Sequence, residues 1–478
     1  MIPYLIRSWR GGISDEADKG ISGSFKFGYG MDIHKKKDTF SCGQAMQTIS
    51  NPAVVTDWIR WFVPCTKDGT TYCFGNGGRI YSRAGNEGAL VFRYADANGD
   101  IKGAHEWVID DGSTYIVWAT DTSVSRKLMI GSNSGMDWGN VELNWKKDLT
   151  PNSWHTMKMA CGNLMICNDL YLAMIDYTGA YTNDALNLRP GNLTKCLEER
   201  DDYVIIGSTR EDNDEKGYIW SWITTALNYV QKKKIPAEGV NALIYTEYPL
   251  LQAGDDGQIF YSDFTNMIPV HAIPGGGKVQ PGGVTEDENL ALFGFYDGSY
   301  PGIWSYGRKN KNRPSVLNYE YRLAKTASGS TVTNIGTIAN INSEILATWK
   351  TIDGSTNEYG VDCASSTTKA TALYEGLEFD AGAPHLKKNF QTAKVTMEPL
   401  PAGCSIALKY KIDRGSWVTA KTADKKTSFS TTDATEAEFI INDDGKVFEV
   451  GLTLTPSANL TPEVLSIVTY LGSETEMH

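Results

Sequence analysis

Two short segments carry residue types that could bind a ligand, but neither has the full spacing of a known motif. Gly275-Gly276-Gly277-Lys278 has the glycines and the lysine of a phosphate-binding loop. Such a loop also needs a glycine five residues before its last glycine and Ser or Thr after the lysine, where this chain has Ala272 and Val279. We therefore interpret the segment as a flexible surface loop.

The second segment, Asp96-Ala97-Asn98-Gly99-Asp100, places oxygen-bearing side chains at alternate positions, as the start of a calcium loop does. An EF-hand loop continues with Gly at its sixth position and Glu at its twelfth, which are Ile101 and Trp107 here. The pattern favours a hairpin turn over a calcium site.

The histidines and cysteines are scattered. No two histidines lie two or four residues apart, no Cys-x-x-Cys occurs, and no Gly-x-Ser-x-Gly nucleophile elbow is present. His105 and His155 are interpreted as ordinary strand residues. Reduced, mostly buried thiols are expected, with a Cys65–Cys73 bridge across a hairpin as the alternative in an oxidising setting. The sequence thus predicts no catalytic residue, no cofactor and no metal.

Composition and charge narrow the class of protein. The chain has 478 residues, of which 41% are hydrophobic and 21% charged, and its formal net charge is −12. This charge argues against a nucleic-acid binder that depends on a global basic field. No apolar run approaches the ~18–20 residues of a membrane helix, and the segment 1–7 has too short an apolar core for a secretory signal.

Glycine and aromatic residues point to β structure. The chain contains 47 Gly, 24 Tyr, 13 Trp and 15 Phe. Strand-like runs alternate with turn dipeptides between residues 55 and 365, and such dipeptides are hairpin signals. The dipeptides are Asp68-Gly69, Asn76-Gly77, Asn98-Gly99, Asp111-Gly112, Asp256-Gly257, Asp297-Gly298 and Asp353-Gly354.

A degenerate repeat runs through the same region. Gly257-Gln258-Ile259-Phe260-Tyr261-Ser262 resembles Gly78-Arg79-Ile80-Tyr81-Ser82, and weaker copies are centred on residues 130, 219 and 303. Leu172–Ile175 and Tyr359–Val361 fill the remaining places. The period of roughly 40–50 residues is that of four-stranded propeller blades. We predict an all-β fold with a β-propeller over residues 41–365. The expected number of blades is about seven, and six to eight fit the length. An irregular multi-sheet β protein is the alternative.

Two local features of this region have simple interpretations. Residues 221–230 fit a helix ended by Lys232-Lys233-Lys234, or almost as well a strand followed by a basic loop. The acidic runs 198–202 and 211–215 are interpreted as solvated loops that keep strand edges from pairing with other chains.

The two ends of the chain differ from the middle. Beyond a polar stretch near residues 364–372, Ile406, Leu408, Tyr410 and Ile412 share one face, with Ser405, Ala407, Lys409 and Lys411 on the other. This pattern predicts an antiparallel β-sandwich over residues 373–478. Residues 1–40 are too aromatic for a disordered tail. They are predicted to form an extended N-terminal arm that packs on the chain's own body or on a neighbouring subunit.

The stretch Trp9–Asp15 and Gly20–His34 resembles the opening of structural proteins of tailed bacteriophages, in which a "GIS…KGI.GSF.FG.GLDI" arm precedes a β-propeller-like body. Residues 38–45 and 75–81 continue the resemblance, and the C-terminal runs 387–390, 400–406 and 410–417 are similar to β-sandwich modules of phage tail proteins. Met31 stands where the family has Leu, a volume-conserving change. The resemblance supplies no catalytic residues.

Three functions follow as expectations. The resemblance implies a non-enzymatic structural component of a virion, most simply of the tail or tail tip, assembled in the bacterial cytoplasm. Its partners would be other virion proteins, further copies of the chain and a host cell-surface glycan. The first alternative is a glycan- or receptor-binding protein that stacks sugars on tryptophans, although each tryptophan fits a blade core better. The candidates are Trp138, Trp145, Trp154, Trp220 and Trp222.

The second alternative is a polysaccharide-degrading propeller enzyme, which would need carboxylates that converge at a pocket. The Ser-x-Asp-x-Gly-x-Thr-Trp turns of sialidase-like propellers do not occur.

Overall fold

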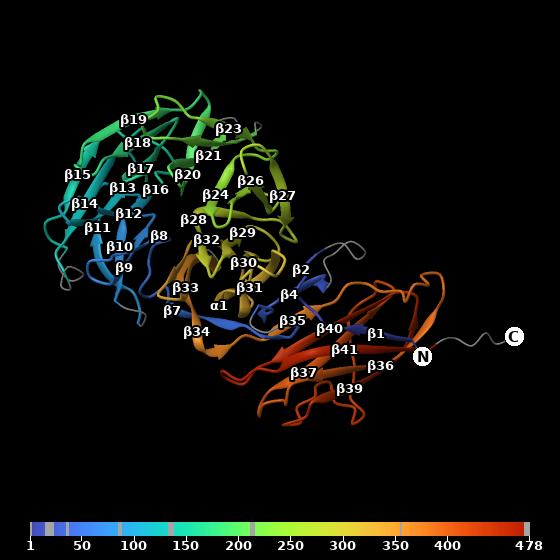
Figure 1. Cartoon of the computed structure of the whole chain (residues 1–478). Helices are drawn as coiled ribbons and strands as arrows, with labels where there is room; N and C mark the ends of the chain where they lie inside the picture. The colour runs from blue at the N-terminus through green and yellow to red at the C-terminus, as the bar shows by residue number, and fades with distance from the viewer. Residues whose placement is uncertain are drawn as a thin grey trace. The chain divides into compact units, whose positions relative to one another are not determined.

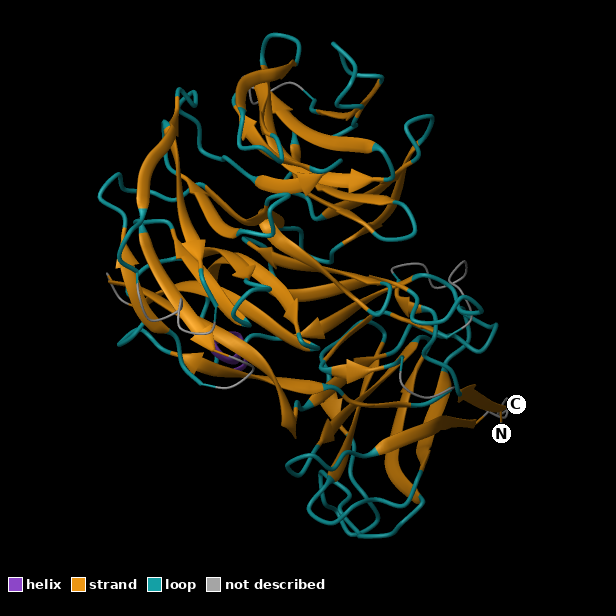
Figure 2. Ribbon diagram, turned by 60° about the vertical axis from the view of Figure 1, so that its left-hand side comes forward, coloured by secondary structure: helices purple, strands orange, loops and turns teal. Residues whose placement is uncertain are grey.

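Strands account for nearly all regular structure in the computed structural model of this chain (Figure 2). The structure describes residues 2–14, 23–34, 38–84, 88–131, 138–210, 216–353 and 356–472. In this part of the chain the only helix is the four-residue α1 (Ala324–Ala327), and no helix is long and apolar enough to cross a membrane. The prediction of an all-β fold is confirmed.

Seven sheets of four strands follow one another along the described chain. The first three are β8 (Ile59–Pro64), β9 (Thr70–Gly75), β10 (Arg79–Ala84) and β11 (Val91–Ala95); β12 (Gly103–Val108), β13 (Thr114–Ala119), β14 (Ser123–Met129) and β15 (Glu142–Lys147); and β16 (Met157–Ala160), β17 (Asn163–Asn168), β18 (Tyr171–Ile175) and β19 (Tyr181–Asn187).

The next three are β20 (Asn192–Arg200), β21 (Tyr203–Arg210), β22 (Tyr218–Trp222) and β23 (Gln231–Lys234); β24 (Val240–Tyr245), β25 (Pro249–Ala253), β26 (Gln258–Ser262) and β27 (Met267–Ala272); and β28 (Lys278–Asp287), β29 (Leu290–Tyr296), β30 (Gly302–Gly307) and β31 (Val316–Tyr321). The seventh sheet combines β32 (Val332–Ile341), β33 (Glu344–Asp353) and β34 (Thr356–Lys369) with β7 (Gln44–Ser50), so a strand that precedes the first blade completes the last one.

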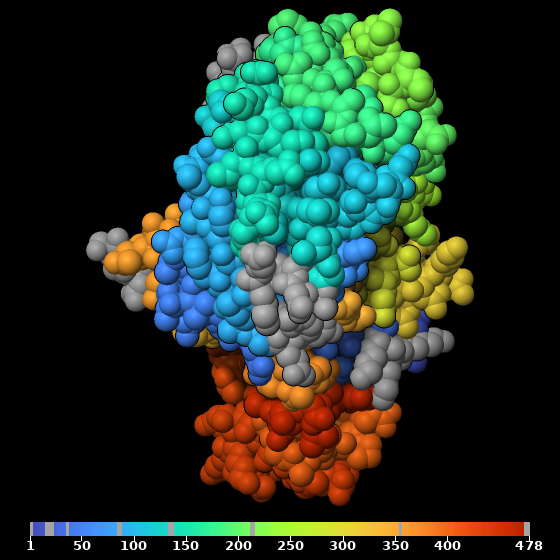
Figure 3. All heavy atoms as spheres, turned by 90° about the vertical axis from the view of Figure 1, so that its left-hand side faces the viewer, coloured from blue at the N-terminus to red at the C-terminus, as the bar shows by residue number. Residues whose placement is uncertain are grey.

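The first strands of these sheets form a closed ring. Each contacts the next, from β8 through β12, β16, β20, β24 and β28 to β32, and β32 contacts β8. Figure 1 shows the sheets arranged around the axis that these strands surround. In Figure 3 the colours of consecutive blades lie beside one another from blue to green. The chain therefore contains a seven-bladed β-propeller, as the repeat predicted.

The repeat found in the sequence corresponds to one strand of each blade. The copies at residues 80, 219, 259 and 303 fall in β10, β22, β26 and β30, and Leu172–Ile175 and Tyr359–Val361 fall in β18 and β34. The copy centred on residue 130 begins in β14 and extends one residue or more past its end at Met129. These are the third strands of the seven sheets. Inner strands have neighbouring blades on both faces, so β9, β25 and β29 are buried along their whole length. The outermost strand β23 is exposed or half-buried along its length, and all four of its residues are polar.

Four local predictions about this region need correction. His155 lies just before β16 and is not a strand residue. Asn98-Gly99 lies between β11 and β12, in the connection from one blade to the next, so it is not a hairpin turn. Residues 221–230 contain no helix, because β22 ends at Trp222 and the basic residues form β23. In the acidic run 198–202, Glu198 and Glu199 belong to the innermost strand β20, and Glu199 accepts a 2.6 Å hydrogen bond from the Cys161 amide. Residues 211–215 lie outside the described residues.

The chain divides into two compact units. Unit 1 comprises residues 1–46, 303–322 and 364–478, and unit 2 comprises residues 47–302 and 323–363. Unit 1 contains two further sheets. Their strands are β1 (Ile2–Ile6), β4 (Phe27–Tyr29), β5 (Met31–Asp32), β6 (Phe40–Cys42), β35 (Ala372–Glu375), β36 (Lys388–Met397), β37 (Ser405–Ile412), β38 (Val418–Thr419), β39 (Glu436–Gly445), β40 (Phe448–Thr455) and β41 (Glu463–Gly472); β2 (Gly12–Ile13) and β3 (Ser24–Phe25) form a separate parallel pair.

Strands near the N-terminus join the sheets that the C-terminal residues build, and β4 and β5 lie at the ends of these sheets. One sheet has the order β39-β36-β41-β6-β5 with β1 also on β41, and the other has the order β38-β37-β40-β35-β4. The two sheets share an aromatic core in which the ring centroids of Phe390 and Phe448 are 4.8 Å apart. Of the two partners that the sequence left open for the N-terminal arm, these strands use the chain's own body.

Candidate functional site

One cavity lies between two neighbouring blades of unit 2. We call this cavity the inter-blade pocket. It has a volume of about 570 Å³ and opens between the sheets β20–β23 and β24–β27. Its volume falls in the range of small-molecule sites. It is lined by Lys216, Pro236, Ala237, Glu238, Ala253, Gly254, Asp255, Asp256, Gln258, Phe260 and Pro269.

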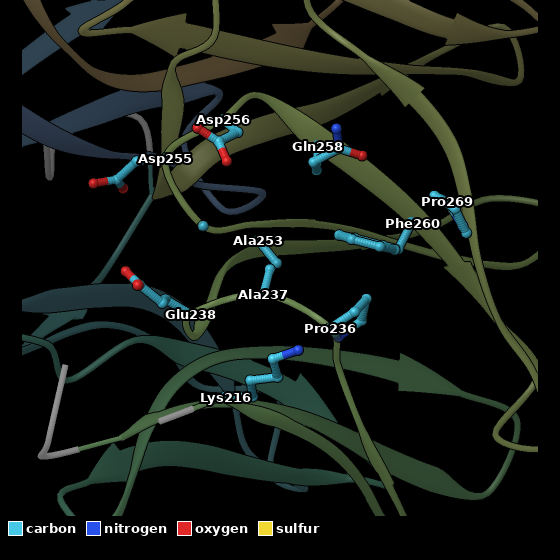
Figure 4. A pocket seen from close by; sticks show the side chains of 11 residues that line it. Lys216, Pro236, Ala237, Glu238, Ala253, Asp255, Asp256, Gln258, Phe260 and Pro269 are labelled. Atoms are coloured by element: carbon cyan, nitrogen blue, oxygen red, sulfur yellow. The ribbon is translucent and has the colours of Figure 1, made fainter. Parts of the chain in front are cut away.

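Loops at one end of the blades supply the polar lining of this pocket. Glu238 lies in the connection from β23 to β24, and Asp255 and Asp256 lie in the turn from β25 to β26. Figure 4 shows Asp255, Asp256 and Gln258 on one side of the pocket and Lys216 on the opposite side, with Phe260 and Pro269 between them. The pocket thus combines acceptor-rich loops, one ammonium group and an apolar wall.

A buried amide pair holds the Asp255 turn in place. The Asn241 Nδ2 group donates to Gln252 Oε1 (2.9 Å) and to the Gly254 carbonyl oxygen (2.8 Å). The Gln252 side chain is completely buried and also accepts from the Val279 amide (3.1 Å). Gly277 of the predicted loop donates its amide to the Asp255 carbonyl oxygen (2.9 Å). The glycine loop therefore braces this turn, and its glycines at 275–277 all have positive φ.

The segment that resembled a calcium loop has a structural role. Asp96 is buried and accepts a 2.6 Å hydrogen bond from the Trp118 indole nitrogen. The Asn98 amide donates to the Asp96 carboxylate (2.8 Å), which closes the turn. In the described part of the chain no three His, Cys, Asp or Glu side chains are grouped so that they could hold a metal ion.

A second cavity, of about 430 Å³, lies at the other end of the ring. All seven innermost strands contribute to its lining. The lining residues include Trp61, His105, Lys158, Glu198 and Tyr245. The Lys158 ammonium and the Glu198 carboxylate form a 2.8 Å ion pair there. Burial, aided by the positive charge of Lys158, lowers the pKa of His105 to about 4, so this imidazole is neutral near pH 7. The sequence identified His105 only as a strand residue.

The carboxyl groups with a raised pKa lie outside both cavities. Burial raises the pKa of Asp57 and of Asp362. Asp57 accepts hydrogen bonds from the backbone amides of Gly77 and Arg79. Asp362 accepts from the Trp349 indole (2.8 Å) and the Ala324 amide (2.7 Å). Both carboxyl groups therefore accept hydrogen bonds that stabilise the local structure of their blades.

The tryptophans proposed for stacking on sugars fall into two groups. Trp138, Trp220 and Trp222 are buried in blade cores. Trp145 and Trp154 are half-buried, and both carry a cation over the ring. The guanidinium of Arg126 covers Trp145 at 4.0 Å, and that of Arg60 covers Trp154 at 3.6 Å from the ring centroid.

All eight cysteines are free, and seven of them are buried. Cys65 and Cys73 are not bridged, although they lie in the paired hairpin β8–β9 region. Burial raises the pKa of both thiols, and for Cys65 the value reaches about 12. The expectation of reduced and mostly buried thiols agrees with this arrangement.

Neither a family model nor a curated protein matches this chain. Among solved structures, the WD40 β-propeller domain of Doa1 is similar with a TM-score of 0.46 and 10% identity, over 67% of this chain and 98% of the other. The β-propeller domain of Myceliophteria_thermophila Cps50 (Swd1) has a TM-score of 0.45 and 11% identity, over 67% and 100%. A computationally designed protein, Ika8, has a TM-score of 0.39 and 14% identity, over 65% and 88%.

Proposed function

We propose that this chain is a non-enzymatic structural component of a bacteriophage virion, most simply of the tail or tail tip. In this account it is assembled in the host cytoplasm and packs against other virion proteins and further copies of itself. A part in host attachment is included in the proposal, because a propeller presents many loops at its two ends.

The observation that carries the proposal is the packing, in unit 1, of the N-terminal residues that resemble phage structural proteins. Phe25, Met31 and Phe40 are completely buried in unit 1. A Cβ at Gly28 would lie 2.8 Å from the Leu373 carbonyl oxygen, and Gly30 has a φ of 62°. Packing within the fold thus explains why the motif has large apolar residues at its buried positions and glycine at positions 28 and 30. A structural role requires such packing and no reactive group.

The surroundings of the carboxylates also favour a non-enzymatic role. A glycosidase acid requires a raised pKa beside a partner carboxylate at the substrate. The two carboxyls with a raised pKa are instead hydrogen-bonded between strands, as described above. They support the fold of the blades.

A glycan- or receptor-binding protein is the second candidate, and the inter-blade pocket favours it. Hydroxyl groups of a saccharide could pair with Glu238, Asp255, Asp256 and Gln258 while the ring lies on the apolar wall. The same three carboxylates keep a polysaccharide-degrading enzyme as the remaining alternative. Hydrolysis of a bound polysaccharide that is lost in Asp255→Asn would favour the enzyme, and binding without hydrolysis would favour the lectin-like function.

Interruption of the gene in the phage that encodes it tests the proposal. Particles made without the chain should lack a tail part under the electron microscope or fail to adsorb, and the chain supplied in trans should restore them. Particles of normal appearance and adsorption would contradict the proposal.

A further inference from the structure

One arginine of the innermost strands is buried without a counter-ion. Arg60 of β8 is only 6% exposed, and its guanidinium lies 3.6 Å from the ring centroid of Trp154 and 5.6 Å from that of Trp58. Its terminal nitrogens donate to Asn76 Oδ1 (2.6 Å) and to the Ser153 carbonyl oxygen (3.3 Å). Its buried Nε has no hydrogen-bond partner. All of its acceptors are neutral.

A lysine approaches the same indole from another blade. The Lys195 ammonium of β20 lies 6.0 Å from the Trp154 ring centroid and donates a 2.7 Å hydrogen bond to Asn241 Oδ1. The Asn241 Nδ2 is committed to Gln252 and Gly254, so its oxygen must face the lysine. This one hydrogen bond leaves two N–H groups of the ammonium without a protein acceptor in the described residues. We call Arg60, Trp154 and Lys195 the axial cation cluster.

Charges around the cluster are not balanced by ion pairs. Within 4 Å, neither Arg60 nor Lys195 has a carboxylate partner in the part of the chain that the structure describes. The next cation, Lys278, is neutralised by Asp255 (3.7 Å) and Asp297 (3.2 Å). Asp57 and Asp100 act on Arg60 only from a longer distance.

Two partly desolvated cations that share one aromatic ring repel each other and lose hydration. Such an arrangement costs free energy in the unliganded protein and favours an anion that supplies the missing charge. Access comes from the solvent side, since Trp154 and Lys195 are half-buried while Arg60 lies beneath them. An oxyanion there would accept hydrogen bonds from the two remaining N–H groups of Lys195, and the positive charge of Arg60 would add a favourable electrostatic interaction.

We propose that the axial cation cluster is a binding site for an oxyanion, either a free inorganic anion or the carboxylate, sulfate or phosphate group of a larger ligand. Arg60 supplies a fixed positive field, Lys195 makes the direct charge-assisted contact, and Asn241 sets the direction of that contact. The site is independent of the virion role proposed above.

Protonation of Lys195 makes the site dependent on pH. Burial lowers the pKa of Lys195 to about 8, with further lowering by Lys278 and Arg60 and opposing effects of Cys196 and Asp255. The ammonium form is therefore complete near pH 6.5 and is lost as the pH rises through about 8. A bound oxyanion stabilises the charged form, so binding near pH 8 should take up a proton.

Isothermal titration of the full chain with sodium sulfate, sodium phosphate, sodium galacturonate and N-acetylneuraminate tests the site. We expect at least one of these probes to bind at pH 6.5 and to bind about 30-fold more weakly at pH 9.5, because only about 3% of Lys195 is then charged. Lys195→Met should abolish this binding. Lys158→Met, at the other end of the ring and in an ion pair with Glu198, is the matched control and should bind as the wild type does.

The probes also separate the two sources of the oxyanion. Binding of sulfate or phosphate identifies a site for free anions, whereas binding of the sugar acids alone identifies an acidic saccharide. Circular dichroism of both variants shows whether they are folded. The proposal is overturned if no probe binds at ~10 mM, a concentration that reveals even weak affinity. Equal binding by folded Lys195→Met would also overturn it.

Discussion

The hydroxyl of Thr348 donates a 2.8 Å hydrogen bond to the carbonyl oxygen of Ile59, two buried residues that are 289 positions apart in the chain. Ile59 begins the innermost strand of the first blade, and Thr348 belongs to β33 of the last blade. The bond therefore spans the point where the ring of blades closes. Gly336 of β32 packs against the same carbonyl group.

Gly336→Ala should weaken this closure. A Cβ at residue 336 would lie 2.0 Å from the Ile59 carbonyl oxygen, and backbone on both sides cannot move without separating β32 from β8. We expect a loss of about 3 kcal/mol in the free energy of unfolding, measured by urea denaturation. Gly43→Ala is the control, because its Cβ would meet nothing closer than 3.4 Å. Equal stability of the two variants would show that the closure is looser than described.

Trp9→Ala should destabilise unit 1. The Trp9 side chain is 1% exposed, and its ring lies 4.6 Å from that of Phe40 and 6.4 Å from that of Tyr374. Loss of a buried indole costs about 3–5 kcal/mol, which calorimetry should detect as a lower melting temperature. Leu227→Ala, at a side chain that is 93% exposed, should leave the melting temperature unchanged. A similar small effect for both would mean that Trp9, in the connection from β1 to β2, is not part of the core.

Asp362→Asn should remove one component of the pH dependence of stability. Burial raises the pKa of Asp362 in the folded chain above its value of 3.8 in the unfolded chain. The folded state therefore binds this proton more tightly, so the stability of the wild type relative to Asp362→Asn falls as the pH rises above 3.8. At pH 7 we still expect the variant to be about 1–2 kcal/mol less stable, because its amide NH₂ cannot accept from Ala324.

Urea unfolding of both proteins between pH 4 and pH 7 measures that difference. If the difference stays constant over this interval, Asp362 does not titrate as its burial implies.

Lys195→Met should make the protein more stable while removing anion binding. The pKa of Lys195 falls from 10.5 in the unfolded chain to about 8 in the folded chain, so near pH 7 the folded protein holds a charged ammonium at a cost. We expect a gain of about 1–3 kcal/mol at pH 7. The gain should shrink as the pH rises from about 8 to 10.5, since the unfolded wild type then binds a proton that the folded one does not. Thermal unfolding at pH 7 and pH 10 provides the comparison, and a destabilised variant would contradict the argument.

The thiols should react with Ellman's reagent in a defined order. Only Cys161 is half-buried, and the other seven cysteines are buried. At most one thiol should react within minutes in the native protein, and all eight should react in guanidinium chloride. Loss of the rapid reaction in Cys161→Ser would assign it, whereas fewer than eight thiols in the denatured, unreduced protein would indicate a disulfide.

The sequence predicted the parts of the fold that depend on local pattern. The third strands of the blades were found because burial between two neighbours selects apolar and aromatic residues at each repeat, as in Ile259 and Phe260 of β26. The alternation of Ile406, Leu408 and Tyr410 likewise marked β37. The prediction of a hairpin turn at Asn98-Gly99 is wrong because this dipeptide occurs both in hairpin turns within a blade and in connections between blades.

Long-range features had no local signal. The strand β1 pairs Tyr4 with Thr469, and no pattern in either segment specifies that partner. Arg60 and Lys195 come from the first and fourth blades and Trp154 from the connection between β15 and β16, so only the closed ring brings them together. Basic and aromatic residues that are scattered in the sequence were therefore interpreted individually. Searching the first two residues of each innermost strand for cations would have found Arg60, Lys158 and Lys278 but not Lys195.

Mass spectrometry of phage particles purified by density-gradient centrifugation tests the proposed virion role most directly. Peptides from both units of the chain should be present in intact particles, in constant ratio to known tail proteins from one preparation to the next. Detection of the chain only in the unassembled fraction, with intact particles that contain none of it, would contradict the role as a structural component of the virion.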